Sequence, residues 1–202
     1  MTRAESRTES NPIVLHFRSV LEHLSDEDFF KFCQLNRDLR IERTKEGDLI
    51  IMPPTGSETG AQNFSLTVQF GIWVRDDATG LGFDSSAGFT LPNGAVRSPD
   101  LAWVKHERWN ALSNEEKRVF APICPDFVVE LPSPSDSLTD LHAKMADYVE
   151  SGAQLGWLID PLERRVYIYK PHCDVECLDR PRTISGEPLL SGFVLDLRTL
   201  WD

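Results

Sequence analysis

The sequence has few cysteines, no excess of positive charge and no long hydrophobic run. Its four cysteines are scattered over 202 residues, at positions 33, 124, 173 and 177. This density excludes a disulfide-stabilised scaffold and favours a reducing compartment. No apolar stretch reaches the ~20 residues that span a bilayer, and the polar first eleven residues lack the apolar segment of a signal peptide. We therefore expect a cytoplasmic protein without a membrane partner.

The net charge of −11 argues against a general nucleic-acid-binding protein. Affinity for nucleic acid comes chiefly from lysine and arginine side chains that neutralise phosphates. An acidic surface does not exclude a nuclease, because a bound cation and a few clustered basic residues can make one cleft positive. If DNA is the partner, its binding should be weak, salt-sensitive or assisted by another protein.

The length and composition indicate a single globular domain. A hydrophobic content of 41% and a charged content of 26% are ordinary for a soluble fold, and 202 residues can bury one substantial core. No repeat or linker interrupts the chain. We expect a disordered tail at residues 1–12 and one domain at residues 13–202.

The first half of the chain predicts helices around a hairpin. In chain order we expect a helix at Val14–Leu24, a helix at Asp26–Leu35 capped by Ser25, a hairpin of Leu39–Thr44 and Leu49–Pro53, and a long helix at Ser57–Arg75. The apolar surface of the long helix is assigned to Phe64, Val68 and Ile72 with the nearby Leu66, Phe70 and Trp73.

The second half predicts strands and one crossover helix. Asn93-Gly94 is a hairpin turn signal that leads into a strand at Val96–Val104. A nearly all-apolar strand at Phe127–Leu131 is typical of the centre of a sheet. A helix at residues 137–150, capped by Ser135 and Asp136, and a strand at residues 155–159 follow, which predicts a right-handed parallel crossover.

Two carboxylates stand beside these apolar runs. Asp100 follows Pro99 inside or at a bend of its strand, and Glu130 emerges from the central strand. A buried, unpaired charge is costly, so something must compensate both acids. Mg²⁺ prefers hard oxygen ligands such as carboxylates and phosphates. Phosphodiester hydrolysis is the sharper interpretation, while each acid taken alone is also consistent with a residue that caps a turn.

Lys144 is the third informative residue. It falls about 40 to 60° from Leu141 and Tyr148 around the predicted helix, on the shoulder of its buried face. From there a lysine can reach over the sheet edge toward a phosphate near Glu130. Asp140 and Asp147 are its acidic neighbours on the helix. An exposed ion pair between Lys144 and one of these acids is therefore the alternative to a catalytic role.

Several motifs together resemble a known family. They are Ser85-Ser86-Ala87-Gly88-Phe89, Leu91-Pro92-Asn93-Gly94, Arg97-Ser98-Pro99-Asp100, Pro125 to Glu130, Ser133 to Asp136, Lys144-Met145, Tyr148, Gly152 and Gly156 to Pro161. Over roughly residues 14 to 201 the chain resembles the Uma-type family of bacterial "putative restriction endonucleases". The resemblance implies an α/β (α+β) fold of the restriction-endonuclease-like PD-(D/E)XK type, a mixed sheet flanked by helices, here with an N-terminal helical and hairpin extension.

The resemblance also implies roles for individual residues. Asp100 and Glu130 would bind Mg²⁺, with Mn²⁺ as a possible substitute. The superfamily expects a lysine two residues after Glu130, where this chain has Pro132. The basic role would then pass to Lys144 on the following helix. Glu58 resembles an auxiliary acid, although an acid in the first turn of a helix is favourable for electrostatic reasons alone.

The sequence therefore predicts a Mg²⁺-dependent endonuclease that hydrolyses DNA. A homodimer is expected by analogy with enzymes that cut two strands. Two alternatives stay open. One is a catalytically impaired nuclease fold that binds nucleic acid or protein, which Pro132 and the acidic charge favour. The other is a nuclease that acts on RNA or on modified or branched DNA.

Overall fold

The computed structural model describes residues 12–16 and 24–201. The helices are α1 (Asp26–Leu35), α2 (Ser57–Asp77), α3 (His106–Asn110), the 3-10 helix η1 (Glu116–Arg118), α4 (Leu138–Glu150) and α5 (Arg198–Trp201). The strands are β1 (Ile13–Leu15), β2 (Arg40–Arg43), β3 (Leu49–Met52), β4 (Gly80–Asp84), β5 (Phe89–Thr90), β6 (Val96–Arg97), β7 (Leu101–Lys105), β8 (Phe127–Glu130), β9 (Leu155–Asp160), β10 (Arg165–Tyr169), β11 (Glu176–Asp179), β12 (Thr183–Ser185) and β13 (Val194–Asp196).

The main sheet has six strands in the order β11-β10-β9-β8-β7-β4. All neighbouring strands are antiparallel except β8 and β9, which are parallel and are joined through α4. Strands β12 and β13 form a separate pair. The sheet is therefore mixed, with its one parallel pair where the sequence predicts the crossover.

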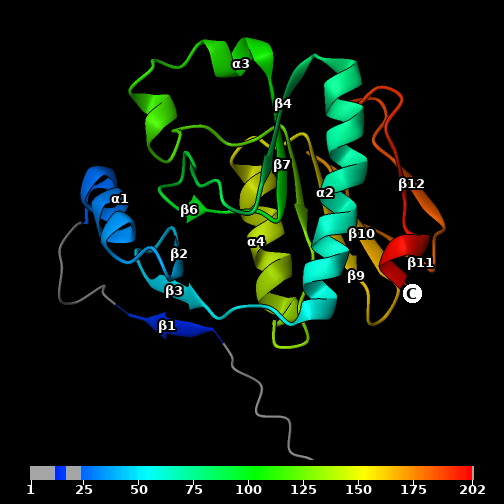
Figure 1. Cartoon of the computed structure of the whole chain (residues 1–202), viewed down its shortest axis with the longest axis horizontal. Coiled ribbons are helices and arrows are strands. Elements are labelled where there is room, and N and C mark those ends of the chain that lie inside the picture. Colours follow the sequence, from blue (N-terminus) through cyan, green and yellow to red (C-terminus); the bar gives the residue numbers. More distant parts are fainter. Residues whose placement is uncertain (1–11, 17–23, 202) are drawn as a thin grey trace, which may run out of the picture.

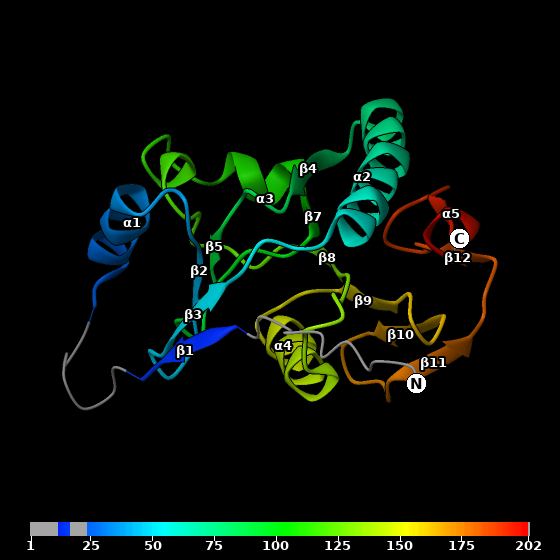
Figure 2. The same ribbon diagram turned by 60° about the horizontal axis from the view of Figure 1, so that its bottom comes forward.

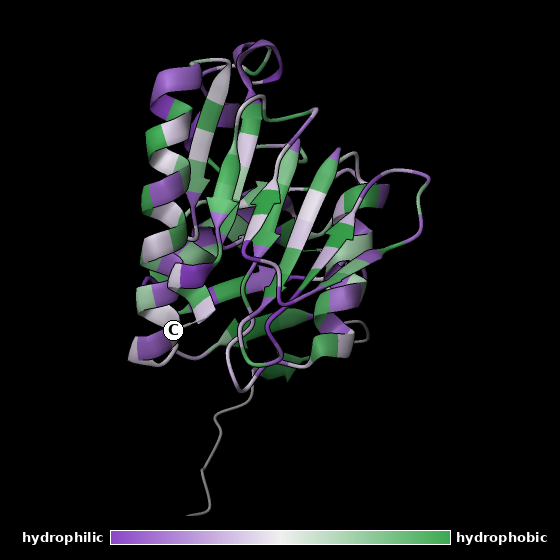
Figure 3. Cartoon of the chain, turned by 90° about the vertical axis from the view of Figure 1, so that its right-hand side faces the viewer, coloured by the Kyte–Doolittle hydropathy of each residue, from purple (hydrophilic) through white to green (hydrophobic). Residues whose placement is uncertain are grey.

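Helices cover both faces of the main sheet (Figures 1 and 2). On one face, Leu66 and Phe70 of α2 pack with Phe127 and Trp157 of the sheet. On the other face, Met145 and Tyr148 of α4 belong to a second core cluster with alternate residues of the same strands. Figure 3 shows how hydrophobic residues dominate the central strands. This two-sided burial explains why β8 reads as a continuous apolar run.

A second, five-stranded sheet lies beside the first. Its order is β1-β3-β2-β6-β5, and all of its strand pairs are antiparallel. Phe29 of α1 packs on it with Ile41, Leu49 and Val96. In Figure 2, strands β1 to β3 lie on one side of α4 and β10 lies on the other. Helix α4 thus stands between the two sheets.

The chain passes from the second sheet to the first at Ser98-Pro99-Asp100. Strand β6 ends at Arg97 in the five-stranded sheet, and β7 begins at Leu101 in the six-stranded sheet. Proline lacks the N–H that a central strand must donate, which accounts for the break at this point. The predicted single strand Val96–Val104 is therefore wrong, and the predicted bend at Asp100 is confirmed.

Most of the predicted elements are confirmed. Helix α1 occupies the predicted residues, and Ser25 Oγ accepts a hydrogen bond from the Asp28 N–H. The hairpin of β2 and β3, the long helix α2 and the fold class are also as expected. No helix in the described ranges has the length and apolar character needed to cross a membrane.

Two predictions need correction, and a third is not tested. The helix expected from Val14 is contradicted by β1, because Ile13–Leu15 pairs with β3, and residues 17–23 of that prediction lie outside the described ranges. The cap of α4 is Ser137, whose Oγ accepts from the Asp140 N–H, and not Ser135 or Asp136. The predicted tail lies almost entirely outside the described residues.

The apolar surface predicted for α2 is confirmed only in part. Leu66 and Phe70 are buried, whereas Phe64, Val68 and Ile72 are 71%, 43% and 52% exposed. Helical spacing places both sets on stripes of period 3 to 4, so periodicity alone does not choose between them.

Candidate active site

Asp100 and Glu130 lie side by side at the ends of neighbouring strands. Strands β7 and β8 are antiparallel, with Leu101 opposite Val129. Asp100 immediately precedes Leu101 and Glu130 immediately follows Val129, so the register places the two acids across from each other. Both are buried. The structure thus brings together the two carboxylates that the sequence singled out.

The carboxylate of Asp100 is held from two directions. Its Oδ2 accepts a 2.8 Å hydrogen bond from the backbone N–H of Leu131. Its Oδ1 faces the guanidinium of Arg40 in β2, with Nη1 at 3.4 Å. Arg40 Nη2 also donates to the carbonyl of Ser98 at 2.6 Å. One arginine of the second sheet therefore fixes the crossing segment that presents Asp100.

Glu130 meets two donors from α4. Lys144 Nζ lies 2.8 Å from Glu130 Oε1, and the Tyr148 hydroxyl donates to the same oxygen at 3.0 Å. No residue in the described ranges donates a hydrogen bond to Oε2. Glu130 therefore keeps one carboxylate oxygen for a further partner.

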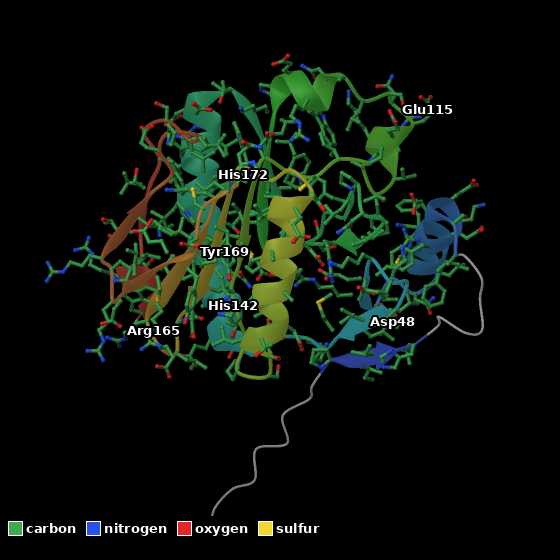
Figure 4. The ribbon with its side chains drawn as sticks, turned by 180° about the vertical axis from the view of Figure 1, so that it is seen from behind. Asp48, Glu115, His142, Arg165, Tyr169 and His172 are labelled. Carbon is green, nitrogen blue, oxygen red and sulfur yellow. The ribbon has the colours of Figure 1, made fainter. Side chains whose placement is uncertain are left out.

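Helix α4 places Lys144 through its packing. Met145 and Tyr148 are fully buried against the sheet. At Gly156 of β9 a Cβ would lie 2.5 Å from Met145 Cε, so the glycine leaves room for this close approach. Lys144 precedes Met145 by about 100° of helical rotation, which turns it toward the second sheet. On another flank, His142 Nδ1 contacts the Tyr169 hydroxyl of β10, as Figure 4 shows.

Glu42 of β2 is a site residue that sequence reasoning missed. It is 2% exposed, and its Oε1 lies 2.9 Å from Lys144 Nζ. The same oxygen accepts a 2.9 Å hydrogen bond from the Ser98 N–H. Lys144 is therefore shared between an acid of each sheet. The only sequence signal is that Arg40 and Arg43 flank Glu42, an unusual density of charge for a four-residue strand.

The ion pairs continue from Glu42 toward the surface. Arg97 Nη1 lies 3.2 Å from Glu42 Oε2, and Arg97 Nη2 lies 3.4 Å from Asp147 Oδ2. Lys45, which is partly exposed, lies 2.7 Å from Asp147 Oδ1. Buried charges thus alternate in sign from Glu130 to the surface. Such pairing is what makes buried charges tolerable.

The acids of this cluster have opposite pKa shifts. Burial raises the pKa of Glu130 to about 7, and the negative charges of Asp100 and Glu42 add to the rise, although the Lys144 ammonium opposes it. Burial also raises the pKa of Asp100, against the opposing effect of Arg40. Burial alone would raise the pKa of Glu42 as well, but Lys144 and Arg97 lower it to about 2. Glu42 is therefore the permanent anion of the cluster.

The basic and phenolic groups keep their ordinary protonation. Burial disfavours the charged form of Lys144, but the nearby Glu130 and Glu42 raise its pKa, so it is an ammonium. Burial raises the pKa of Tyr148 well above its usual value, and Glu130 adds to this rise. Tyr148 is therefore a neutral hydroxyl that donates to Glu130.

The donor set at the strand ends suits a hard divalent cation. Two carboxylates with raised pKa values lie together, and a cation nearby would favour their ionised forms. Mg²⁺ in phosphoryl-transfer sites is commonly bound by one or two carboxylates plus water and substrate phosphate. In the described ranges, no three His, Cys, Asp or Glu residues form a group that could enclose a metal ion. Asp100 and Glu130 supply the two carboxylates that a site of this kind uses.

Two other residues of the sequence analysis lie as follows. Pro132 is buried two residues after the end of β8, so the position at which the resemblance predicts a lysine offers no cation. Glu58 is exposed in the first turn of α2. No hydrogen bond or ion pair in the described part of the chain joins Glu58 to Asp100, Glu130 or Lys144. The auxiliary role of Glu58 stays a prediction.

Comparisons with known proteins agree with this architecture. Residues 26–198 match the family described as "Uma2: Putative restriction endonuclease". No curated protein matches the sequence. The fold is similar to that of "a putative nuclease belonging to DUF820" from Anabaena variabilis ATCC 29413. The TM-score is 0.67 and the identity is 21%, over 80% of this chain and 89% of that one.

The structural similarity shows that this chain shares the fold of that protein. The family match extends over most of the chain and includes Asp100, Glu130 and Lys144. Its description supports a nuclease function. The chain belongs to the Uma2 family.

Proposed function

We propose that this protein is a Mg²⁺-dependent endonuclease that hydrolyses DNA. The observation that supports this most strongly is the meeting of Asp100, Glu130 and Lys144, in which Lys144 Nζ lies 2.8 Å from a Glu130 carboxylate oxygen. The three residues come from β8, α4 and the segment that joins the two sheets. Their convergence in a buried site, despite the cost of desolvating them, indicates a purpose beyond stability.

In this proposal Asp100 and Glu130 hold the ion, and Mn²⁺ can replace Mg²⁺. When bound, the ion would lower the pKa of a water molecule and polarise the scissile phosphate. Lys144 stabilises negative charge that develops on the phosphate, which is the role of a preorganised cation in a dry site. Glu42 and Tyr148 are positioning residues. Glu42 holds the ammonium of Lys144 from the opposite side, and Tyr148 orients the Glu130 carboxylate.

The lysine on α4 replaces the one that Pro132 excludes. A side chain two residues after Glu130 would start from the loop after β8, whereas Lys144 reaches the same carboxylate from the covering helix. The proposed chemistry needs an ammonium group beside the phosphate, and any segment of the chain can supply it.

Cleavage of supercoiled plasmid DNA tests the proposal. With Mg²⁺ or Mn²⁺ the purified protein should nick the plasmid, and EDTA should stop the reaction. Asp100→Asn and Glu130→Gln should each reduce nicking by at least about a thousandfold, because each removes a charged ligand. Glu115→Gln is the matched control, since Glu115 is exposed and lies far from α4 (Figure 4). Nicking that survives both site substitutions would refute the proposal.

A second candidate is a nuclease fold that binds nucleic acid or protein without turnover. The observation in its favour is that Lys144 is paired with both Glu42 and Glu130, so the buried charges already balance one another. In that case Asp100→Asn and Glu130→Gln would leave binding unchanged, and no metal-dependent nicking would be seen with DNA or RNA.

A further inference from the structure

Two hollows border the buried charge cluster, and they differ in charge. The larger, of about 890 Å³, lies between α4 and the β2–β3 hairpin and is lined by Glu42, Arg97 and Lys144 among others. Six acidic and three basic side chains line it. The smaller, of about 590 Å³, lies between the end of α1 and the crossing segment, and Arg37 and Arg40 line it with a single acid, Asp38. The two hollows thus have opposite charge balance.

The smaller hollow is directly connected to the site. Arg40 and Ser98 both line it. Arg40 Nη1 lies 3.4 Å from Asp100 Oδ1, so the same guanidinium borders the hollow and holds a proposed metal ligand. A third of the Arg40 side chain is exposed. A ligand in the hollow would therefore lie one side chain away from Asp100.

We infer that the smaller hollow is the phosphate-binding entrance for the nucleic-acid substrate, an inference that rests on the proposed nuclease function. Guanidinium groups match phosphate oxygens in geometry and charge. Ser85 and Ser98 also line the hollow, and serine hydroxyls are common phosphate donors in protein–DNA contacts. The larger hollow is unsuited to a polyanion, because its acidic lining repels phosphate.

This assignment explains how a chain of net charge −11 can bind a polyanion. Only the local potential at the entrance needs to be positive, and the acidic remainder of the surface repels the substrate from other approaches. Arg37 is exposed, and within the described ranges its side chain makes one hydrogen bond, to the Gln34 carbonyl of its own segment. Its guanidinium is therefore available to a phosphate.

Fluorescence anisotropy with a labelled DNA duplex in EDTA tests the entrance without cleavage. Arg37→Glu should weaken binding about tenfold or more, because a charge-assisted phosphate contact is lost and repulsion is introduced. Arg40 is unsuitable for this test because it also holds Asp100. Arg75→Glu makes the same charge change on exposed α2, and Lys45→Glu makes it in the larger hollow. Each control should weaken binding less than about threefold, because neither Arg75 nor Lys45 lines the smaller hollow and exposed charges at a distance are screened by salt.

The outcomes separate this inference from the proposed function. Equal weakening by Arg37→Glu and Arg75→Glu would show a general charge effect and overturn the entrance. If Lys45→Glu weakened binding more than Arg37→Glu, the substrate would bind at the larger hollow, and the entrance would be overturned. In both cases metal-dependent nicking that needs Asp100 would leave the nuclease proposal standing. A wild-type protein that binds no duplex in EDTA would overturn the entrance, whereas only the absence of metal-dependent nicking would overturn the proposed function.

Discussion

The two sheets contribute to the site in opposite ways. The six-stranded sheet supplies Glu130 from a strand whose other residues are apolar and fully buried. The five-stranded sheet supplies Arg40 and Glu42 from β2, in which three of four residues are charged. Both acids end up buried, yet the pKa of Glu130 is raised and that of Glu42 is lowered. The difference lies in their partners, because Glu42 faces Arg97 as well as Lys144.

This contrast shows that a proposed metal ligand and the residue that positions its cationic neighbour need different surroundings. Among the residues that the structure describes, Glu130 has one ion-pair partner, Lys144, and one carboxylate oxygen that accepts no hydrogen bond, so it can respond to a cation. Glu42 is saturated with donors and stays charged. Lys144 is paired with an acid of each sheet, so its removal should change the surroundings of both Glu130 and Glu42.

We expect Lys144→Met to have the largest effect on stability. It leaves Glu130 and Glu42 buried without the cation that they share, which costs about 3 kcal/mol or more of unfolding free energy. Urea denaturation at pH 8 measures this loss. The double variant Glu130→Gln with Lys144→Met should recover most of it, because it removes both charges, while Glu42 keeps Arg97. A cost below about 1 kcal/mol would contradict the buried geometry, since an exposed ion pair contributes no more than that.

The two glutamates should affect stability in opposite pH ranges. Between pH 4.5 and about 7 the folded protein keeps a proton on Glu130 that the unfolded chain has released, so stability falls as pH rises through this range. Between about pH 2 and 4.5 the unfolded chain binds a proton at Glu42 that the folded protein does not. Stability from Glu42 is therefore fully present above pH 4.5 and is lost as pH falls toward 2.

Urea midpoints from pH 3 to 8 check this prediction. Relative to wild type, Glu130→Gln should flatten the decline between pH 4.5 and 7, and Glu42→Gln should flatten the rise below pH 4.5. Identical pH profiles for the two variants would show that the glutamates are equivalent. If Glu130 binds the metal ion, the nicking rate should also rise with pH through about 7, because the ligand must be ionised.

The smallest expected effect is at the cap of α4, the helix that presents Lys144. Ser137→Ala removes the hydroxyl that accepts from the Asp140 N–H and should cost about 1 kcal/mol in urea denaturation. Ser135→Ala is the matched control, because Ser135 makes no cap and only its hydroxyl contact to Ser133 is lost. Equal costs for the two variants would contradict the assignment of the cap. Nicking should persist in both, since the packing of Met145 and Tyr148 holds the helix in place.

Local signals were sufficient for much of the fold and part of the site. Strand β8 was predictable from its apolar run, and the β5–β6 turn from Asn93-Gly94, where Gly94 has a φ of +87°. Asp100 and Glu130 stood out because each acid adjoins residues that must be buried. Lys144 was placed on the shoulder of its helix by periodicity alone.

The remaining features depend on contacts that no local pattern contains. Glu42 is one example, because its ion pair with Lys144 depends on the approach of α4 to the hairpin. Strand β1 has three residues, which is too short for a period-2 pattern to be distinguished from the start of a helix. Ser135 and Ser137 are equally good caps by type, and the tertiary position of α4 selects the second.

The short crossing at Ser98-Pro99-Asp100 has a consequence for changes in chain length. Both of its ends are fixed in hydrogen-bonded sheets, and successive residues of extended chain point to opposite sides. Insertion or deletion of one residue there would turn the Asp100 carboxylate away from Glu130, even with every amino acid retained. The same change in the exposed turn at Leu162 and Glu163 would leave both acids in place. The crossing is thus a spacer of fixed length, and its number of residues is as essential to the site as their identity.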